Sequence, residues 1–257
     1  MLLATWNVNS VRVRLPRVVE FLEKHHPDAL LMQETKADPG AFPHLELEAA
    51  GYRVADHSGG RWAGVAIAAR ADLGLTDVRA GLPDEPDAGE ARWIEATVAG
   101  VRLASVYVPN GREVGSPTFV AKLAFLEAMA GRAAQLAAAP AMVAGDMNVC
   151  PTDADVYDPA AFVGSTHVTP EERERLGRAI AAGLVDAYRA LHPDDVGFTW
   201  WDYRQGHFHR GLGLRIDLAL VSAGLASRLR SCGIDRDFRK GPKPSDHAPL
   251  LVELADG

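Results

Sequence analysis

The stretch Ala141-Met142-Val143-Ala144-Gly145-Asp146-Met147-Asn148 is an apolar run that ends in an acid and, two residues later, in an amide. A short apolar run without proline predicts a buried β-strand. Side chains at i and i+2 of an extended chain point to the same side, so Asp146 and Asn148 can face one site. The stretch therefore predicts a buried strand that delivers two polar groups to the end of a sheet.

Five other apolar segments end in, or follow, a polar side chain of a kind used in catalysis. One such residue alone is most often a strand cap or a turn residue. Several strands that all deliver polar groups to their ends indicate one polar cleft at the mouth of the sheets. The residues at these positions are Asn7, Glu34, Tyr107, Asp217 and the pair Asp246-His247.

Strands dominate both halves of the chain, and helices fall between them. The predicted strands are 1–8, 28–34, 52–56, 64–70, 92–98, 102–108, 141–146, 215–221 and 247–253, and the predicted helices are about 15–22, 118–138 and 171–182. Thr169 and Pro170 suit the N-cap and first position of the last helix. This order predicts an α/β fold of two packed β-sheets with outer helices. No repeat or shift in composition divides the chain, so we expect a single domain over residues 1–257.

The composition is that of an ordinary globular protein, with 47% hydrophobic and 24% charged residues. No apolar run approaches the roughly 18 residues needed to span a bilayer. The N-terminus lacks the basic region and cleavage site of a signal peptide. Cys150 and Cys232 lie far apart and fit no metal-binding or redox spacing. We therefore expect a cytoplasmic protein without a membrane segment.

The formal net charge of −7 argues at first against a nucleic-acid partner, because phosphate contacts need Lys and Arg. Binding depends on local charge, however. Residues 204–215 include three Arg and two His without an acid, and residues 236–243 include four bases and one acid. Such runs are most often solvated faces, so they only keep DNA binding open. We expect His207 and His209 to be loop histidines and not metal ligands.

The ring of His247 needs a carboxylate partner if it is to work in a fixed orientation. Asp246 and His247 point apart in an extended segment, so Asp246 is poorly placed to hold the ring. Asp217, from another strand, is the best candidate. The alternatives are that Ser245-Asp246-His247 is a capped turn and that Asp217 faces solvent.

The types of candidate ligand favour a hard cation. Carboxylates and amides, without Cys pairs or a His-x-x-x-His spacing, suit Mg²⁺ and not structural Zn²⁺. Glu34 is the strongest candidate ligand. We expect Asp146 to take a proton from water, and Asn148 to orient that water or a phosphate oxygen. Electrostatic stabilisation by the metal, His247 and Tyr107 would supply the rest of the catalysis.

Five short motifs, in this order, resemble the exonuclease III family of abasic-site endonucleases. They are Trp6-Asn7-Val8-Asn9-Ser10-Val11-Arg12, Met32-Gln33-Glu34-Thr35-Lys36, Gly145-Asp146-Met147-Asn148, Leu214-Arg215-Ile216-Asp217 and Ser245-Asp246-His247-Ala248-Pro249. Their order and approximate spacing match from the first strand to the last. The ordered set is far more specific than any single motif.

This resemblance implies a four-layer α/β sandwich and Mg²⁺-dependent cleavage on the 5′ side of an abasic site, with Mn²⁺ able to replace Mg²⁺. It also implies 3′-to-5′ exonuclease and 3′-phosphodiesterase activities. The implied partner is double-stranded DNA with abasic sites or blocked 3′ ends, and the implied enzyme is a monomer.

Carried over position by position, the resemblance also implies a role for individual residues. The implied metal ligands are Asn7, Glu34, Asp146, Asn148, Asp246 and His247. The implied catalytic residues are Tyr107, Asp146, Asn148, Asp217 and His247. The implied substrate-binding residues are Asn9, Asn110, Arg112, Trp200 and Arg215.

Two features bear on substrate. Trp200 and Trp201 cannot both face inward from an extended segment, so we expect Trp200 to pack its flat face against the abasic sugar or an adjoining base. The stretch 116–122 keeps only one of the bases that relatives often place there, and Glu113 adds an acid. These departures bear on DNA affinity and on the balance between endonuclease and exonuclease activity.

Two other functions are compatible with parts of the pattern. A related enzyme that hydrolyses a non-DNA phosphate ester, such as a sphingolipid or an inositol phosphate, would use the same polar set. A non-catalytic DNA-binding module would have no need of Asp146 or His247. The tryptophan pair and the basic run 204–215 favour the DNA enzyme.

Overall fold

Two six-stranded sheets face each other at the centre of the structure, a computed structural model in which residues 1–255 are described. The first sheet consists of β1 (Leu2–Asn7), β2 (Ala29–Gln33), β3 (Tyr52–His57), β4 (Val65–Arg70), β11 (Leu229–Ile234) and β12 (Leu250–Leu254). Their order across the sheet is β11-β12-β1-β2-β4-β3. Only β1 and β2 run parallel to each other, so the sheet is mixed.

The second sheet is also mixed. It consists of β5 (Thr76–Ala80), β6 (Trp93–Val98), β7 (Val101–Tyr107), β8 (Ala141–Asp146), β9 (Leu184–Asp186) and β10 (Asp217–Ser222). Their order is β5-β6-β7-β8-β10-β9, and the central pair β7 and β8 is parallel. All nine predicted strands are therefore confirmed, with ends that differ by at most three residues.

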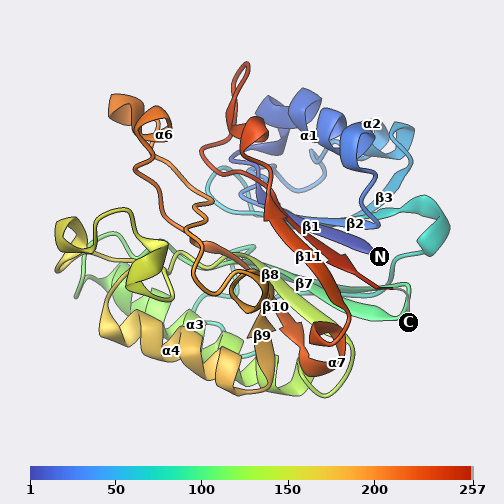
Figure 1. Cartoon of the computed structure of the whole chain (residues 1–257). Coiled ribbons are helices and arrows are strands. Elements are labelled where there is room, and N and C mark those ends of the chain that lie inside the picture. The colour runs from blue at the N-terminus through green and yellow to red at the C-terminus, as the bar shows by residue number, and fades with distance from the viewer. Residues whose placement is uncertain (256–257) are drawn as a thin grey trace.

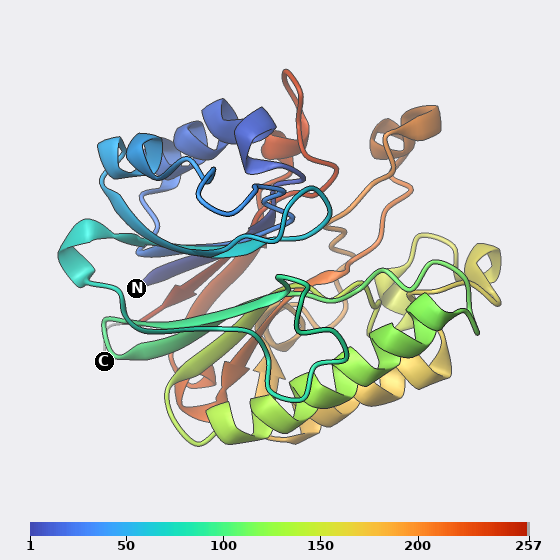
Figure 2. The same ribbon diagram turned by 180° about the vertical axis from the view of Figure 1, so that it is seen from behind.

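Helices cover the outer face of each sheet, which completes four layers (Figures 1 and 2). The helices are α1 (Val11–His25), α2 (His44–Ala49), α3 (Pro117–Leu136), α4 (Pro170–Ala181), α5 (Ala187–Leu191), α6 (His207–Arg210) and α7 (Ala223–Ala226). Short 3₁₀ turns occur at Ala71–Leu73, Asp153–Asp155, Pro159–Phe162, Arg204–Gly206 and Arg236–Arg239. The predicted α/β fold, a four-layer sandwich of two mixed sheets flanked by helices, is confirmed. No helix within residues 1–255 has the length and apolar character needed to cross a membrane.

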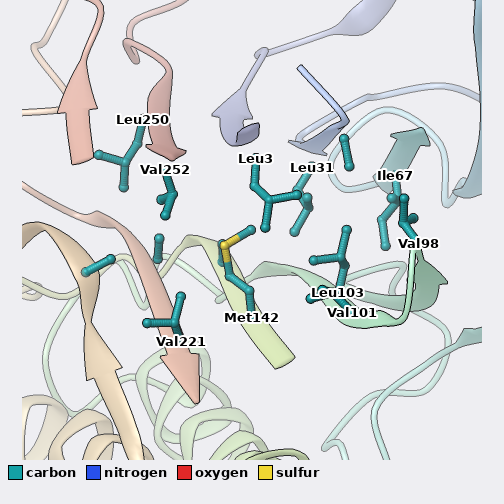
Figure 3. Close-up of a cluster of buried hydrophobic side chains, with 14 of the residues drawn as sticks. Leu3, Leu31, Ile67, Val98, Val101, Leu103, Met142, Val221, Leu250 and Val252 are labelled. Atoms are coloured by element: carbon teal, nitrogen blue, oxygen red, sulfur yellow. The ribbon is translucent and has the colours of Figure 1, made fainter. Parts of the chain in front are cut away.

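Apolar side chains from the inner faces of both sheets fill the space between them (Figure 3). The labelled residues are Leu3, Leu31, Ile67, Val98, Val101, Leu103, Met142, Val221, Leu250 and Val252, all buried. The outer faces are buried as well, because helices lie on them. Strands such as β2 and β8, with every residue buried, therefore appear in the sequence as continuous apolar runs without alternation.

The start of α4 is fixed by its local sequence. Thr169 Oγ1 accepts a hydrogen bond from the backbone N–H of Glu172, and Glu172 Oε2 accepts one from the N–H of Thr169. This reciprocal capping box satisfies two N–H groups that a helix start leaves unpaired. The predicted N-cap at Thr169 is confirmed.

Three strands and four short helices, α2, α5, α6 and α7, were not predicted from the sequence. Strands β5, β9 and β11 were not predicted, because β5 is exposed throughout, β9 has three residues and β11 buries only Cys232 fully. His207 and His209 lie in α6 and not in a loop, which corrects the prediction for that segment. Positive φ at Gly206 and Gly211 delimits this single helical turn.

Candidate active site

Three neighbouring strands of the second sheet, β7, β8 and β10, present polar side chains at the same end of the sheet. In the register of the sheet, Asp146 at the end of β8 pairs with Tyr107 of β7 on one side and with Asp217 of β10 on the other. All three residues are buried, Asp217 completely. A continuous row of a phenol and two carboxylates therefore closes this end of the sheet.

The first sheet contributes Asn7 at the end of β1 and Glu34 just after β2. Asn7 Nδ2 donates to Glu34 Oε1 at 2.8 Å and to Asp146 Oδ2 at 2.9 Å. The second of these bonds crosses from one sheet to the other. Glu34 has a φ of 48°, a left-handed conformation that costs energy for a residue with a side chain. The site thus lies where the two sheets meet.

His247 lies between the two aspartates of the second sheet. Its Nδ1 is 2.8 Å from Asp217 Oδ2, and its Nε2 is 3.7 Å from Asp146 Oδ2. The predicted pairing of Asp217 with His247 is confirmed. A carboxylate on Nδ1 fixes the orientation of the ring and leaves Nε2 facing Asp146.

Burial and neighbouring charges shift the pKa values of both Asp146 and His247. Burial raises the pKa of Asp146 to about 7; the charge of His247 opposes this rise, while Asp217 and Glu34 add to it. Burial alone would lower the pKa of His247, but the negative charges of Asp217 and Asp146 outweigh it and raise that pKa to about 10. His247 is therefore a cation at neutral pH. Burial, together with Glu34 and Asp146, also raises the pKa of Tyr107, which stays protonated.

The loop after β8 turns Asn148 back toward the site. Asn148 has a φ of 50°, and its backbone N–H donates to Asp146 Oδ1 at 2.9 Å. Its side-chain Nδ2 donates to the carbonyl of Val108 at 2.8 Å, and its Oδ1 accepts from Asn110 Nδ2 at 3.3 Å. These bonds hold Asn148 and Asn110 side by side at the rim.

A second hydrogen-bonded chain crosses the other side of the site. Asp246 Oδ2 accepts from Trp200 Nε1 at 3.0 Å, and Asp246 Oδ1 accepts from Asn9 Nδ2 at 2.9 Å. Asn9 Oδ1 in turn accepts from Lys36 Nζ at 2.6 Å, and Lys36 Nζ lies 2.7 Å from Glu34 Oε2. Lys36 was not among the predicted site residues.

One cavity connects these side chains. It is lined by Glu34, Tyr107, Asn110, Asp146, Asn148, His167, Trp200, Ile216, Asp246 and His247. Trp201 is fully buried while Trp200 is half-buried at the cavity wall, so the prediction that only one of the pair faces inward is confirmed. His167 and Ile216 were missed, and nothing in the irregular segment around His167 distinguishes it in sequence. Burial and the charge of Lys122 lower the pKa of His167 to about 4, so this ring is neutral.

The residues present fit a hard divalent cation. Ligand atoms of Glu34, Asp146 and His247 all lie within 4.8 Å of one another. Glu34 and Asp146 offer the carboxylate oxygens that Mg²⁺ prefers. Protonated His247 suits hydrogen bonding to a phosphate better than metal coordination. Asn7 turns Nδ2 toward the carboxylates while its Oδ1 accepts from the N–H of Asn9, so as a metal ligand it would have to reverse its amide.

Two of the predicted substrate-binding residues, Arg215 and Arg112, do not line the cavity. Arg215 is 1% exposed and is ion-paired with Asp155 at 2.6 Å and Asp186 at 2.8 Å. It has no surface for DNA, so its predicted role in substrate binding is wrong; its guanidinium is held by buried acids. Arg112 is exposed with a φ of 55° and lies beyond the cavity wall, two residues from Asn110.

Known proteins resemble the chain over its whole length. The family model described as the Endonuclease/Exonuclease/phosphatase family matches residues 4–247. Exodeoxyribonuclease III of Haemophilus influenzae is 32% identical, over 97% of this chain and 98% of the relative. A solved 3′ phosphatase from Neisseria, bound to a product DNA hairpin, is 38% identical with a TM-score of 0.96 and covers 100% of both chains.

An AP endonuclease structure from Archaeoglobus fulgidus is 35% identical with a TM-score of 0.95 and covers 99% of both chains. The match therefore extends through both sheets and through every strand that carries a site residue. The chain belongs to the endonuclease/exonuclease/phosphatase family, among its exodeoxyribonuclease III-type AP endonucleases.

Proposed function

We propose that the protein is a DNA repair nuclease that hydrolyses the phosphodiester 5′ to an abasic site. We further propose 3′-to-5′ exonuclease and 3′-phosphodiesterase activities at the same site, with Mg²⁺ or Mn²⁺ as the cofactor. The observation that carries the proposal is the buried meeting of Asn7, Glu34, Asp146 and the Asp217–His247 pair where the two sheets join. Membership of a nuclease family and a relative bound to product DNA support it.

Phosphodiester hydrolysis needs a base, a means of orienting water and positive charge on phosphate. In the proposed reaction, a carboxylate oxygen of Asp146 takes a proton from water as the water oxygen attacks phosphorus. The bond from phosphorus to the leaving 3′ oxygen breaks, and that oxygen takes a proton from solvent. Asn148 orients the attacking water or a phosphate oxygen. A general base of this kind contributes about 10²- to 10⁴-fold.

Positive charge comes from two sources. His247 offers Nε2–H to a phosphoryl oxygen while Asp217 keeps the ring charged and oriented. Tyr107, protonated because burial raises its pKa, offers its hydroxyl to phosphate. A divalent cation bound by Glu34, with Asp146 and Asp246 beside it, would offset negative charge on the phosphate and the leaving oxygen.

Substrate contacts are proposed for the end of the sandwich that carries the site. Trp200 lies at the wall of the cavity that Asn110 also lines, and its flat face can pack there against the abasic sugar or an adjoining base. The segment around α6 projects from the sandwich at the end opposite the chain termini (Figures 1 and 2). Arg204 and Arg210 are exposed there and can contact phosphates. Asn9 and Arg112 complete the proposed contacts.

We propose that residues 1–257 act as one catalytic domain and as a monomer. A reducing, cytoplasmic compartment fits the two cysteines, which are both buried and unbridged.

The test is cleavage of a labelled duplex that carries one abasic analogue, with Mg²⁺ and then with excess chelator. A single nick 5′ to the analogue that is lost with chelator is the expected result. A duplex with a 3′-phosphate, assayed in parallel, measures 3′-end processing. Absence of cleavage on both duplexes, together with turnover of an inositol phosphate or a sphingolipid, would replace the DNA substrate with the rival one.

A further inference from the structure

A lysine lies fully buried beneath the rim of the active site. Lys122, on the inner face of α3, has a side chain with 0% exposure. Its Nζ donates to the carbonyl of Asn148 at 2.7 Å and to the carbonyl of Asn110 at 3.1 Å, and it lies 3.0 Å from Thr166 Oγ1. Lys122 is the one base of the stretch 116–122, and its burial leaves it no surface on which to contact DNA.

The counter-ion of this ammonium is Glu172, also 0% exposed. Glu172 Oε1 accepts from Lys122 Nζ and from the backbone N–H of His167, and its Oε2 accepts from the N–H and hydroxyl of Thr169. The capping carboxylate of α4 is thus also the partner of a lysine from α3. Four oxygens surround the three N–H donors of the ammonium, so its hydrogen-bonding capacity is fully used.

The backbone around the lysine is shaped to admit it. Gly111 has a φ of +86°, and a Cβ added there would lie 2.8 Å from Lys122 Cδ and 3.0 Å from Thr166 Oγ1. Any side chain at this position would collide with the lysine stem. The loop that carries Asn110 therefore packs against the Lys122 side chain and also accepts its hydrogen bond.

The two carbonyls that Lys122 binds belong to the two asparagines whose amides meet at the rim of the cavity. Asn110 Nδ2 donates to Asn148 Oδ1, and both residues line the cavity. Because one ammonium ties both backbones, the relative position of the two amides depends on it. Asn148 also has a φ of 50°, a conformation that persists only where its surroundings impose it.

We propose that Lys122 is a positioning residue for the cleavage reaction, which holds the Asn148 and Asn110 amides in place from beneath the site through its ion pair with Glu172. The inference rests on the proposed nuclease function. It predicts that Lys122 acts mainly on turnover, because its own side chain touches no surface that DNA can reach.

The same helix offers a matched control. Arg132, also on α3, is ion-paired with the buried Glu95 of β6 at 2.7 Å, and this pair lies on the outer side of the sheet. Arg132→Met removes a cation from a buried glutamate, as Lys122→Met does, although Arg102 stays paired with Glu95 at 2.7 Å. Both variants should lower the melting temperature. Only Lys122→Met should lower kcat per folded molecule, by about 10- to 100-fold, with KM within about threefold of wild type.

A double variant keeps the test valid if Lys122→Met does not fold. Lys122→Met with Glu172→Gln removes both charges, and Gln at this position still completes a capping box. Neutralising a buried pair costs far less stability than removing one partner. Melting temperature should therefore recover while kcat stays low, because the donors to Asn148 and Asn110 are still missing. Recovery of kcat together with stability would overturn the inference.

A readout independent of activity separates this inference from the proposed function. The side-chain NH₂ signals of Asn148 and Asn110 in ¹H–¹⁵N spectra should move in the double variant and stay in place in Arg132→Met. If wild type does not cleave DNA, the proposed function fails while the spectra still test the positioning. If wild type cleaves and the double variant matches its kcat and its spectra, the role of Lys122 is refuted.

Discussion

Two groups of buried charges lie within the same sandwich and differ in how their charges balance. The Arg215 cluster contains Arg215, Arg189, Asp155 and Asp186, two cations and two anions joined at 2.6 to 2.8 Å. Burial alone would raise the pKa of Asp155, but the hydrogen bonding and charge of Arg215, together with hydrogen bonds from Thr152 and Arg189, outweigh it and hold that pKa below its usual value.

The catalytic cluster contains Glu34, Asp146, Asp217 and His247, and Lys36 pairs with Glu34 at its edge, so three acids face one protonated imidazole and one ammonium. Its closest contact between Asp146 and His247 is 3.7 Å, too long for a hydrogen bond. Here burial and neighbouring acids raise the pKa of Asp146 instead of lowering it. In a balanced cluster each buried charge is compensated, so loss of one partner is costly, whereas a cluster with surplus negative charge is suited to bind a cation and to take up a proton.

Removal of the base should give the largest effect. Asp146→Asn should lower kcat by on the order of 10² to 10⁴ while DNA binding survives, because only the proton acceptor is lost. Single-turnover cleavage and a DNA-binding titration measure the two quantities. A variant whose kcat stays within about threefold of wild type would remove Asp146 from the base role.

Removal of Arg215, the central cation of the Arg215 cluster, should lower stability and leave turnover nearly unchanged. Arg215→Met leaves Asp155 and Asp186 buried without their main partner, so the free energy of unfolding should fall by about 3 to 5 kcal/mol. Urea denaturation measures the loss. The kcat of the folded fraction should change little, and a large drop in kcat at full folding would show that Arg215 takes part in the reaction.

Neutralisation of the His247 partner should displace the pH dependence of the reaction. Asp217 is the largest contribution that raises the pKa of His247 to about 10, so Asp217→Asn lowers that pKa. The imidazolium is then lost at a lower pH, and the alkaline limb of the pH–rate profile should move downward. We expect a loss of roughly tenfold at alkaline pH. An alkaline limb that does not move would exclude His247 as the titrating group.

The smallest loss of stability is expected at Arg189, on the exposed side of the Arg215 cluster. Arg189 is 22% exposed and shares Asp155 with Arg215. Arg189→Met should lower the free energy of unfolding by only about 1 kcal/mol, because water screens this partner and Arg215 remains. A loss as large as that of Arg215→Met, measured by the same urea denaturation, would mean that the two cations act as one unit.

The strands that are buried on both of their faces could be predicted from the sequence. β1, β2 and β8 are mostly apolar, and each ends at, or one residue before, a residue that the structure brings to the site. Side-chain alternation argued against Asp246 as the partner of His247 and left Asp217 as the best candidate, a pairing that the structure confirms. Strands β5 and β11 escaped prediction because few of their side chains are buried, so their pairing is decided by neighbours distant in sequence.

The missed residues share a different cause. Arg215 lies two residues before Asp217, in a motif that resembles a catalytic one, yet its partners Asp155 and Asp186 come from separate elements. Lys122 likewise finds Glu172 fifty residues away. Whether a basic side chain meets DNA or a buried acid depends on tertiary contacts, which neither composition nor periodicity encodes.

The most direct test of the surplus negative charge is Mn²⁺ binding, followed by electron paramagnetic resonance. Wild type should bind Mn²⁺ saturably, Glu34→Gln should lose that binding, and Asp186→Asn in the balanced cluster should keep it. This outcome would place the cation in the catalytic cluster. Equal Mn²⁺ binding by wild type and Glu34→Gln would contradict the assignment of the metal to this site.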